Sequence, residues 1–238
     1  MFRLDQQDEV ATLMLDRPRA RNAIPATGWR ELAALLDDFG PSAARLLVVS
    51  GAGGAFCAGA DVADLAAFRT DEAGRTACRT DIRAALDRLR ELPMPTVAVV
   101  EGPCYGAGVA LAMACDLRVA TPSASFAITP AKIAISYPQE DVHRLVELVG
   151  PGQAARLLFS AQTIGAEEAL RIGLAELHDP QEAISAMLAN DPASLATLKR
   201  AIGLAAQGRR SDETQDREFD RLIGEEALAR RLEALRRK

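Results

Sequence analysis

The sequence predicts an α/β fold, because short apolar runs typical of strands alternate with segments typical of helices. Residues 45–50 and 96–100 each contain a continuous apolar stretch, as expected for strands buried on both faces of a parallel sheet. A glycine-containing loop follows each stretch, at residues 56–61 and 102–108, and a helix-like segment follows each loop. These two segments are called the first and second glycine loops below.

The N-terminal part is expected to hold one strand, one loop and one helix. Residues 10–15 have the pattern of a strand, and residues 17–25 form an irregular basic loop that ends at a proline. Apolar side chains then recur at a spacing of three to four, which predicts a helix with Thr27 as its N-cap and Gly40 as its stop.

The segment between the glycine loops is expected to form two helices. Asp61 and Asp64 resemble a capping pair for the first helix, at residues 62–68. Residues 69–80 are charged and rich in threonine, and we expect them to be the most mobile stretch of the chain. The second helix is predicted at residues 81–92, before two prolines that stop it.

The second half of the chain is expected to alternate briefly and then to become helical. The predicted elements are a small-residue helix at residues 106–115, strands at 117–120 and 125–128, and helices at 140–148, 152–158 and 166–172. Only helical patterns follow residue 181. The last pattern, at residues 225–238, is amphipathic and strongly charged, which favours a docking helix or an oligomer contact.

Length and composition indicate a single domain. The 238 residues suffice for one full hydrophobic core, and the net charge of −5 gives no reason to expect nucleic acid or an anionic membrane as a partner. No apolar stretch is long enough to span a bilayer and no targeting peptide is recognisable, so we expect a cytoplasmic protein. No metal-ligand spacing occurs, so we expect no metal, and we expect free thiols that fill the core at Cys57, Cys78, Cys104 and Cys115.

The two glycine loops predict an anion site built from backbone amides. A strand that leads through a glycine loop into a helix leaves unpaired N–H groups at the positive end of the helix dipole. Two such loops facing each other could hold one negatively charged oxygen. Either loop alone is also compatible with a simple tight turn. A dinucleotide site is disfavoured, because Phe56 and Leu111 stand where G-x-G-x-x-G needs its third glycine.

Four motifs follow one another along the chain. They are Arg17-Pro18-x-x-x-Asn22-Ala23, Gly54-x-Phe56-Cys57-Ala58-Gly59-Ala60-Asp61, Glu101-Gly102-x-x-x-Gly106-x-Gly108 with Ala112–Asp116 behind it, and Glu168-Ala169-x-x-x-Gly173-Leu174. In order and spacing they resemble the crotonase (enoyl-CoA hydratase/isomerase) superfamily over about residues 8–200. The resemblance implies a crotonase-like spiral of ββα repeats over residues 1–190 and, in the same domain, a C-terminal helical trimerisation region over residues 191–238. It also implies a homotrimer or a dimer of trimers.

The same resemblance implies which residues form the site. The amides of Ala60 and Ala107 would form an oxyanion hole for the enolate of an acyl-CoA thioester, with coenzyme A as part of the substrate and no separate cofactor. The residues implied in substrate binding are Arg19, Ala20, Ala58, Gly59, Asp61, Gly106, Gly108 and Pro130. Arg19 and Arg21 are equally compatible with ordinary solvated side chains.

The catalytic carboxylates of the family's hydratases are missing. By ungapped register their two glutamates fall at Ala110 and at Pro130 or Ala131, and the aspartate of some isomerases and dehalogenases falls near Pro138. None of these side chains can hold or release a proton. Water addition by the two-glutamate mechanism is therefore disfavoured.

Tyr137 is the residue expected to take over proton transfer. Residues 129–143 resemble the corresponding segment of methylmalonyl-CoA decarboxylase, a crotonase relative with a similar Thr-Pro, tyrosine and histidine spacing and with a histidine at the position of Ala60. A phenol near the α-carbon could orient a carboxylate or return a proton to the enolate. Glu140 and Asp141 are reserve acids, although carboxylates at a helix start more often lie on the surface.

These patterns predict an acyl-CoA lyase or isomerase of the enoyl-CoA hydratase family that works through an enolate. Decarboxylation or proton transfer fits the missing glutamates better than hydration, the usual activity of the family. The alternative is a crotonase scaffold that binds acyl-CoA or a protein partner without catalysis.

Overall fold

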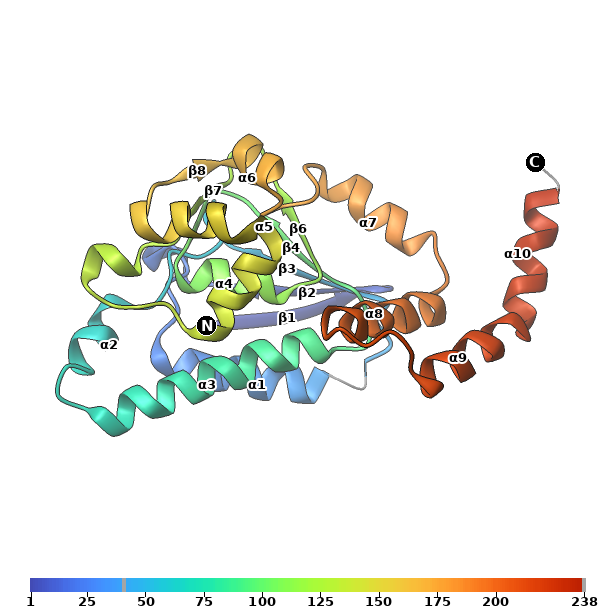
Figure 1. Ribbon diagram of the computed structural model, residues 1–238, viewed down its shortest axis with the longest axis horizontal. Coiled ribbons are helices and arrows are strands. Elements are labelled where there is room, and N and C mark those ends of the chain that lie inside the picture. Colours follow the sequence, from blue (N-terminus) through green and yellow to red (C-terminus); the bar gives the residue numbers. More distant parts are fainter. Residues whose placement is uncertain (40–41, 237–238) are drawn as a thin grey trace.

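The computed structural model describes residues 1–39 and 42–236 and has a five-stranded sheet at its centre (Figure 1). In sheet order, the strands are β1 (Phe2–Gln7), β2 (Val10–Leu15), β3 (Leu46–Gly51), β4 (Thr96–Val100) and β6 (Leu117–Ala120). The strands from β2 to β6 are parallel, whereas β1 pairs antiparallel with β2. The predicted α/β class is confirmed.

Strand β3 is buried on both faces, as its apolar stretch predicts. Leu47 and Val49 pack into the main core, whereas Leu46 and Val48 pack into a second cluster that includes Ala183 of α7 (Pro180–Leu188). The sequence prediction lacks β1, because this edge strand is mostly exposed and polar and shows little apolar alternation.

A second, three-stranded sheet carries the second glycine loop. It consists of β5 (Pro103–Tyr105), β7 (Ser125–Ala127) and β8 (Ile164–Gly165). The chain runs from β4 through β5 into helix α4 (Ala107–Ala114), and from β6 through β7 toward helix α5 (Gln139–Ser160). This succession is the ββα repeat that the sequence predicts.

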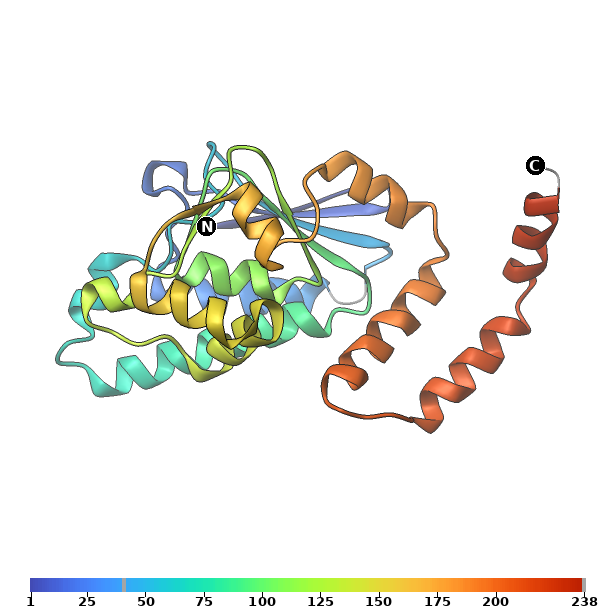
Figure 2. The same ribbon diagram turned by 45° about the horizontal axis from the view of Figure 1, so that its top comes forward.

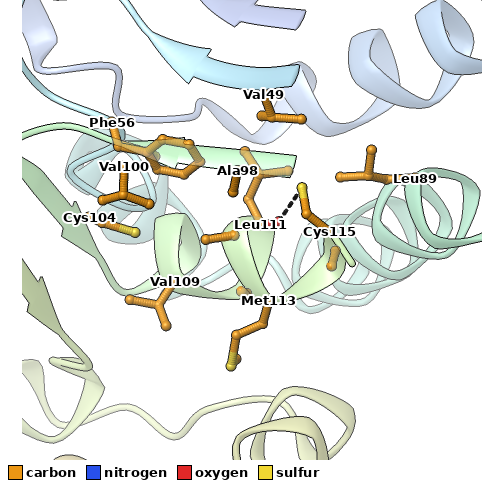
Figure 3. Packing of buried hydrophobic residues seen from close by; sticks show 14 of the residues in the cluster. Val49, Phe56, Leu89, Ala98, Val100, Cys104, Val109, Leu111, Met113 and Cys115 are labelled. Atoms are coloured by element: carbon orange, nitrogen blue, oxygen red, sulfur yellow. Dashed lines mark hydrogen bonds between the residues drawn. The ribbon is translucent and has the colours of Figure 1, made fainter. Parts of the chain in front are cut away.

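Helix α4 forms the centre of the main core. It consists of small and apolar residues, nearly all of them buried, and it contacts α3 (Glu72–Glu91), α5 and β6. Figure 3 shows Leu111 of α4 and Cys115, which follows the helix as its C-cap, interleaved with side chains of β3, β4 and α3. Helix α1 (Ala26–Phe39) packs along α3. Small residues on α4 let these neighbours approach closely, which helps to hold its N-terminus in a fixed place.

The predicted start of the second helix at residue 81 is wrong, since α3 begins at Glu72 and takes in most of residues 69–80. Asp71 caps this helix by accepting a hydrogen bond from the amide of Gly74 at 2.8 Å. The half-helix is largely exposed, so it lacks the buried apolar period that marks a helix in a sequence.

The predicted caps of α1 and α2 (Val62–Ala67) are confirmed only in part. Asp61 caps α2 through the amide of Ala63, as expected. The carboxylate of Asp64, however, accepts a hydrogen bond from the amide of Ala26 at 2.6 Å, so it caps the neighbouring α1. Thr27 lies inside α1 and is not its N-cap. The predicted stop at Gly40 lies outside the described residues.

The elements predicted for the second half are present, and two of the predicted helices are merged. The predicted helices at 140–148 and 152–158 belong to α5, which bends at Gly150 before Pro151. Helix α6 (Ala166–Ile172) follows β8, and the short 3-10 helices η1 (Pro18–Ala20) and η2 (Pro130–Ile133) precede α1 and α5, respectively.

The C-terminal region is helical, as predicted. It contains α8 (Pro192–Ala206), α9 (Glu213–Ile223) and α10 (Glu226–Arg236), and Figures 1 and 2 show α9 and α10 extending away from the body of the molecule. Lys199 of α8 binds the carboxylate of Asp116 at 2.9 Å and the carbonyl of Met94 at 3.0 Å, which ties α8 to the sheet. Within the described ranges, no helix is both long and apolar enough to cross a membrane.

Arg118 is a buried charged residue at the end of the sheet remote from the glycine loops. Its guanidinium donates to the carbonyls of Leu174 and Cys115, each at 3.0 Å, and forms an ion pair with Glu176. Because the side chain is almost fully buried, its charge is tolerated only with these partners in place.

Arg118→Met is expected to lower the free energy of unfolding by about 3–5 kcal/mol, since it leaves the carbonyls of Leu174 and Cys115 without the guanidinium and removes the ion-pair partner of Glu176. Chemical denaturation measures the change. The matched control is Arg230→Met, which removes an exposed arginine paired with Glu226 on α10 and should cost less than about 0.5 kcal/mol. Equal stability of the Arg118 variant and the wild type would contradict the assignment.

Candidate active site

The two glycine loops are joined by backbone hydrogen bonds. The amide of Cys57 donates to the carbonyl of Pro103 at 2.9 Å, and the amide of Tyr105 donates to the carbonyl of Cys57 at 2.8 Å. Cys57 and Cys104 therefore form a short parallel bridge. The loops meet again beyond it, because a Cβ placed on Gly59 would lie 3.7 Å from the amide nitrogen of Ala107.

The amides of Ala60 and Ala107 lie in this junction without a hydrogen-bond acceptor among residues 1–39 and 42–236. Gly59 and Asp61 on either side of Ala60 are both bonded to the backbone of Ile24, at 2.8 and 2.9 Å. Ala107 is the first residue of α4, where a helix leaves its N–H groups unpaired. Both alanines are only half-buried. The two predicted amides thus lie near the junction of the loops, on half-buried residues.

Tyr137 reaches the second loop from the segment between η2 and α5. Its hydroxyl donates to the carbonyl of Gly106 at 3.0 Å, immediately before Ala107. Burial raises the pKa of Tyr137 well above its ordinary value, and the nearby Asp141 raises it further. The phenol is therefore neutral at physiological pH. Its hydroxyl also lies near the amide of Ala110, the turn at which the resemblance implies a glutamate.

The two reserve acids, Glu140 and Asp141, differ in burial. Glu140 is exposed, whereas Asp141 is buried and lies 3.5 Å from Nη1 of Arg83 on α3. Burial raises the pKa of Asp141 to about 6, although Arg83 acts in the opposite direction. Both acids border a cavity of about 20 Å³ between α3 and α5, large enough for about one water molecule, whose other lining residues are Arg79, Ile82, Arg83 and Pro138.

Asp61, predicted to bind substrate, already has partners within the protein. Its carboxylate accepts hydrogen bonds from Arg17 at 2.8 Å and from the amide of Ala63 at 3.1 Å. The hydrogen bond from Arg17 lowers the pKa of Asp61. Arg19 on η1, by contrast, is exposed and has no side-chain partner in the described part of the chain.

The other predicted binding residues surround the junction. Ala58 is bonded through its amide to the carbonyl of Arg21 at 2.9 Å, which places the first loop beside η1 and Ala20. Gly106 and Gly108 flank Ala107, and Pro130 begins η2, whose C-terminal end leads toward Tyr137.

Asn22 is a supporting residue whose role the sequence does not reveal. It is fully buried, and its side chain accepts a hydrogen bond from the amide of Arg17 at 2.9 Å. The same side chain donates to the carbonyls of Ala52 and Ala55, at 2.9 and 2.7 Å. The Arg17-to-Asn22 motif thus fastens the N-terminal loop to the start of the first glycine loop. The motif is visible in the sequence, but its hydrogen-bond partners depend on the fold.

The cysteines fill the core, as predicted. Cys57, Cys104 and Cys115 are buried and Cys78 is half-buried, and all four are free thiols. Burial raises the pKa of Cys57 and of Cys115 to about 12 and that of Cys104 well above its usual range. They remain protonated and are poor nucleophiles.

Comparison with known proteins identifies relatives over most of the chain. Residues 5–226 match the family described as "Enoyl-CoA hydratase/isomerase". The chain is 39% identical over 175 residues to the Mycobacterium bovis protein named "Probable enoyl-CoA hydratase echA6", covering 74% of this chain and 69% of that protein. It is 30% identical to the short-chain-enoyl-CoA hydratase of Clostridium acetobutylicum over 86% of this chain and 81% of that one.

Solved structures of similar proteins have the same fold. An enoyl-CoA hydratase from Bacillus anthracis superposes with a TM-score of 0.88 at 28% identity, covering 99% of this chain and 96% of that chain. An enoyl-CoA hydratase/isomerase family protein from Hyphomonas neptunium gives a TM-score of 0.90 at 31% identity, covering 98% and 94% of the two chains.

Asp141→Asn is expected to change how stability depends on pH. The pKa of Asp141 is about 6 in the fold against an ordinary value of 3.8, so the folded protein binds this proton more tightly than the unfolded chain. Wild-type stability should therefore fall as the pH rises between these values. At roughly 1.4 kcal/mol per pKa unit, the wild type should lose about 3 kcal/mol relative to the variant between about pH 4 and pH 7. Urea unfolding of both proteins across this range measures the loss, and a difference that stays constant would contradict it.

Proposed function

The chain belongs to the enoyl-CoA hydratase/isomerase family, and from this membership we propose that it acts on an acyl-CoA thioester through an enolate held by the amides of Ala60 and Ala107. The observation that carries the proposal is the pair of unbonded amides where the glycine loops meet. Fixed donors of this kind stabilise charge that develops on the thioester oxygen, because they need no reorganisation during the reaction. No cofactor is needed beyond the coenzyme A of the substrate.

We propose Tyr137 as the proton donor to the enolate. Its neutral hydroxyl donates a hydrogen bond to the carbonyl of Gly106, the residue that precedes Ala107. The positions where the family's hydratases carry glutamates hold Ala110 and Pro130 or Ala131 instead. Isomerisation or methylmalonyl-CoA decarboxylase-like chemistry therefore fits the site better than hydration, although hydratases are prominent among the relatives named above.

We propose that the coenzyme A phosphates bind near η1. Arg19 and Arg21 are exposed, and neither side chain has a partner within the described ranges. Arg17, in contrast, is engaged by Asp61, which leaves less of its charge for a ligand. Free guanidinium groups beside the first loop suit phosphate recognition.

We also propose assembly as a homotrimer or a dimer of trimers through the C-terminal helices. Several large apolar side chains of α8, α9 and α10 are exposed in the single chain, namely Leu198, Ile202, Phe219, Ile223, Leu228, Leu232 and Leu235. Apolar faces of this extent are typical of surfaces that a partner covers.

A non-catalytic acyl-CoA- or partner-binding scaffold is the second candidate, because the expected glutamates are absent. Incubation with enoyl-, 3-hydroxyacyl- and methylmalonyl-CoA thioesters, followed by mass spectrometry, distinguishes the two. Loss of carbon dioxide, gain of water or a shifted double bond each supports an enzyme and names the reaction. Tight binding without any product supports the scaffold, and absence of binding removes both.

Tyr137→Phe is expected to lower kcat by about 100-fold on whichever thioester the protein converts, while KM changes less than about threefold, because the donor acts mainly in the transition state. The matched control is Tyr105→Phe, which removes a hydroxyl that contacts Oγ of Ser125 at 3.3 Å and should leave kcat within about threefold. Steady-state kinetics measure both. An unchanged kcat in the Tyr137 variant would exclude this residue from proton transfer.

A further inference from the structure

The side chain of Cys57 makes contacts that thiol chemistry does not explain. It is fully buried and remains protonated, so it is unsuited to attack a substrate. Its sulfur nevertheless accepts a hydrogen bond from the amide of Gly59 at 3.4 Å and lies 3.8 Å from the carbonyl of the same residue, to which it can donate.

Gly59 needs this partner because it is buried and conformationally special. Its φ of +108° is a backbone conformation that L side chains rarely adopt. A Cβ at this position would also lie only 3.0 Å from the carbonyl oxygen of Tyr105. Gly59 has no side chain that could make a stabilising contact. Without the sulfur of Cys57, its buried amide would have no acceptor.

The same cysteine also touches the other half of the site. A Cβ on Gly108 would lie 2.8 Å from Cβ and 3.2 Å from Sγ of Cys57, so the first turn of α4 rests directly on this side chain. Gly59 precedes Ala60, and Gly108 follows Ala107. One small side chain therefore contacts the residue next to each of the two amides.

We infer that Cys57 is a positioning residue that sets the distance between the amides of Ala60 and Ala107. It does so by holding Gly59 through its sulfur and by supporting Gly108 through its bulk. The inference deepens the proposed function and rests on it, since the two amides matter as a pair only if they bind one oxygen. Alanine at position 57 removes the acceptor, whereas serine keeps a group that can accept and donate.

The first experiment measures amide hydrogen exchange by NMR in the full-length protein. In Cys57→Ala, the amide of Gly59 should exchange at least about tenfold faster than in the wild type, because its acceptor is lost. Cys57→Ser should stay closer to the wild type. Cys115→Ala is the control, since Cys115 is an equally buried thiol whose sulfur lies 3.9 Å from the carbonyl of Leu111, outside both loops. Unchanged exchange at Gly59 in Cys57→Ala overturns the inference.

The second experiment isolates the hole itself by comparing the binding of butyryl-CoA with that of S-butyl-CoA, a thioether that lacks the carbonyl oxygen. The wild type should prefer the thioester. Cys57→Ala should lose at least about fivefold of that preference while its affinity for S-butyl-CoA stays within about twofold, and Cys57→Ser should retain the preference. Where turnover is measurable, kcat should fall by about tenfold or more with little change in KM.

The outcomes separate the two levels of the proposal. An equal loss of affinity for both ligands in Cys57→Ala indicates general damage and overturns the positioning role. A wild type that binds neither ligand removes the proposed function, and the exchange measurement alone then decides whether Cys57 holds Gly59. If Cys57→Ala does not fold, protection of the Gly59 amide in the wild type decides, and exchange at the rate of an open loop overturns the inference.

Discussion

The backbone pairing of Cys57 with Pro103 and Tyr105 is the interaction on which the candidate site depends. It joins a loop that follows β3 to a strand that follows β4, so that two segments nearly fifty residues apart share one register. A parallel pairing also makes both loops run in the same direction. The amides of Ala60 and Ala107, which follow the bridge in their loops, can therefore remain unpaired on the same side. Helix α4 begins where the loops meet.

The opposite side of the first loop is fixed by the N-terminal segment. The side-chain amide of Asn22 accepts a hydrogen bond from one backbone group and donates to two others. Arg17 connects this segment to Asp61. The Arg17–Asp61 pair is partly exposed and contributes little stability by itself. The pair acts together with two other contacts of this region. Asp61 also caps α2, and Asn22 has no buried donor of its own unpaired. The first loop is thus held between two neighbours and has little freedom to move its amides.

Sequence reasoning succeeds where one short segment determines the structure by itself. The buried strands β3 and β4 carry continuous apolar stretches, and the small residues of α4 mark a helix that others approach closely. It fails where the determinant lies in another part of the chain. Asp64 caps α1 across a separation of 38 residues, and Asp141 at the start of α5 is buried next to Arg83 of α3. The first half of α3 is missed because an exposed helix carries no buried period. The sequence supports the pairing of the Ala60 and Ala107 amides only as a hypothesis, because nothing in either glycine loop specifies that it faces the other.

The electrostatics around the loops keep the phenol of Tyr137 protonated. Burial raises the pKa of both Tyr137 and Asp141, and the nearby Asp141 raises that of Tyr137 further. A phenol held neutral beside unpaired amides can protonate an enolate, and it adds no negative charge that would compete with the enolate for the amides. A glutamate at position 110 would place an anion in this neighbourhood and could serve as a base, but alanine stands there. The chain thus has two unpaired amides that could bind an anionic oxygen, and it lacks carboxylates at the positions where the family's hydratases are expected to carry them. This combination supports a reaction in which the enolate is generated by loss of a group from the substrate and is then protonated by a neutral acid.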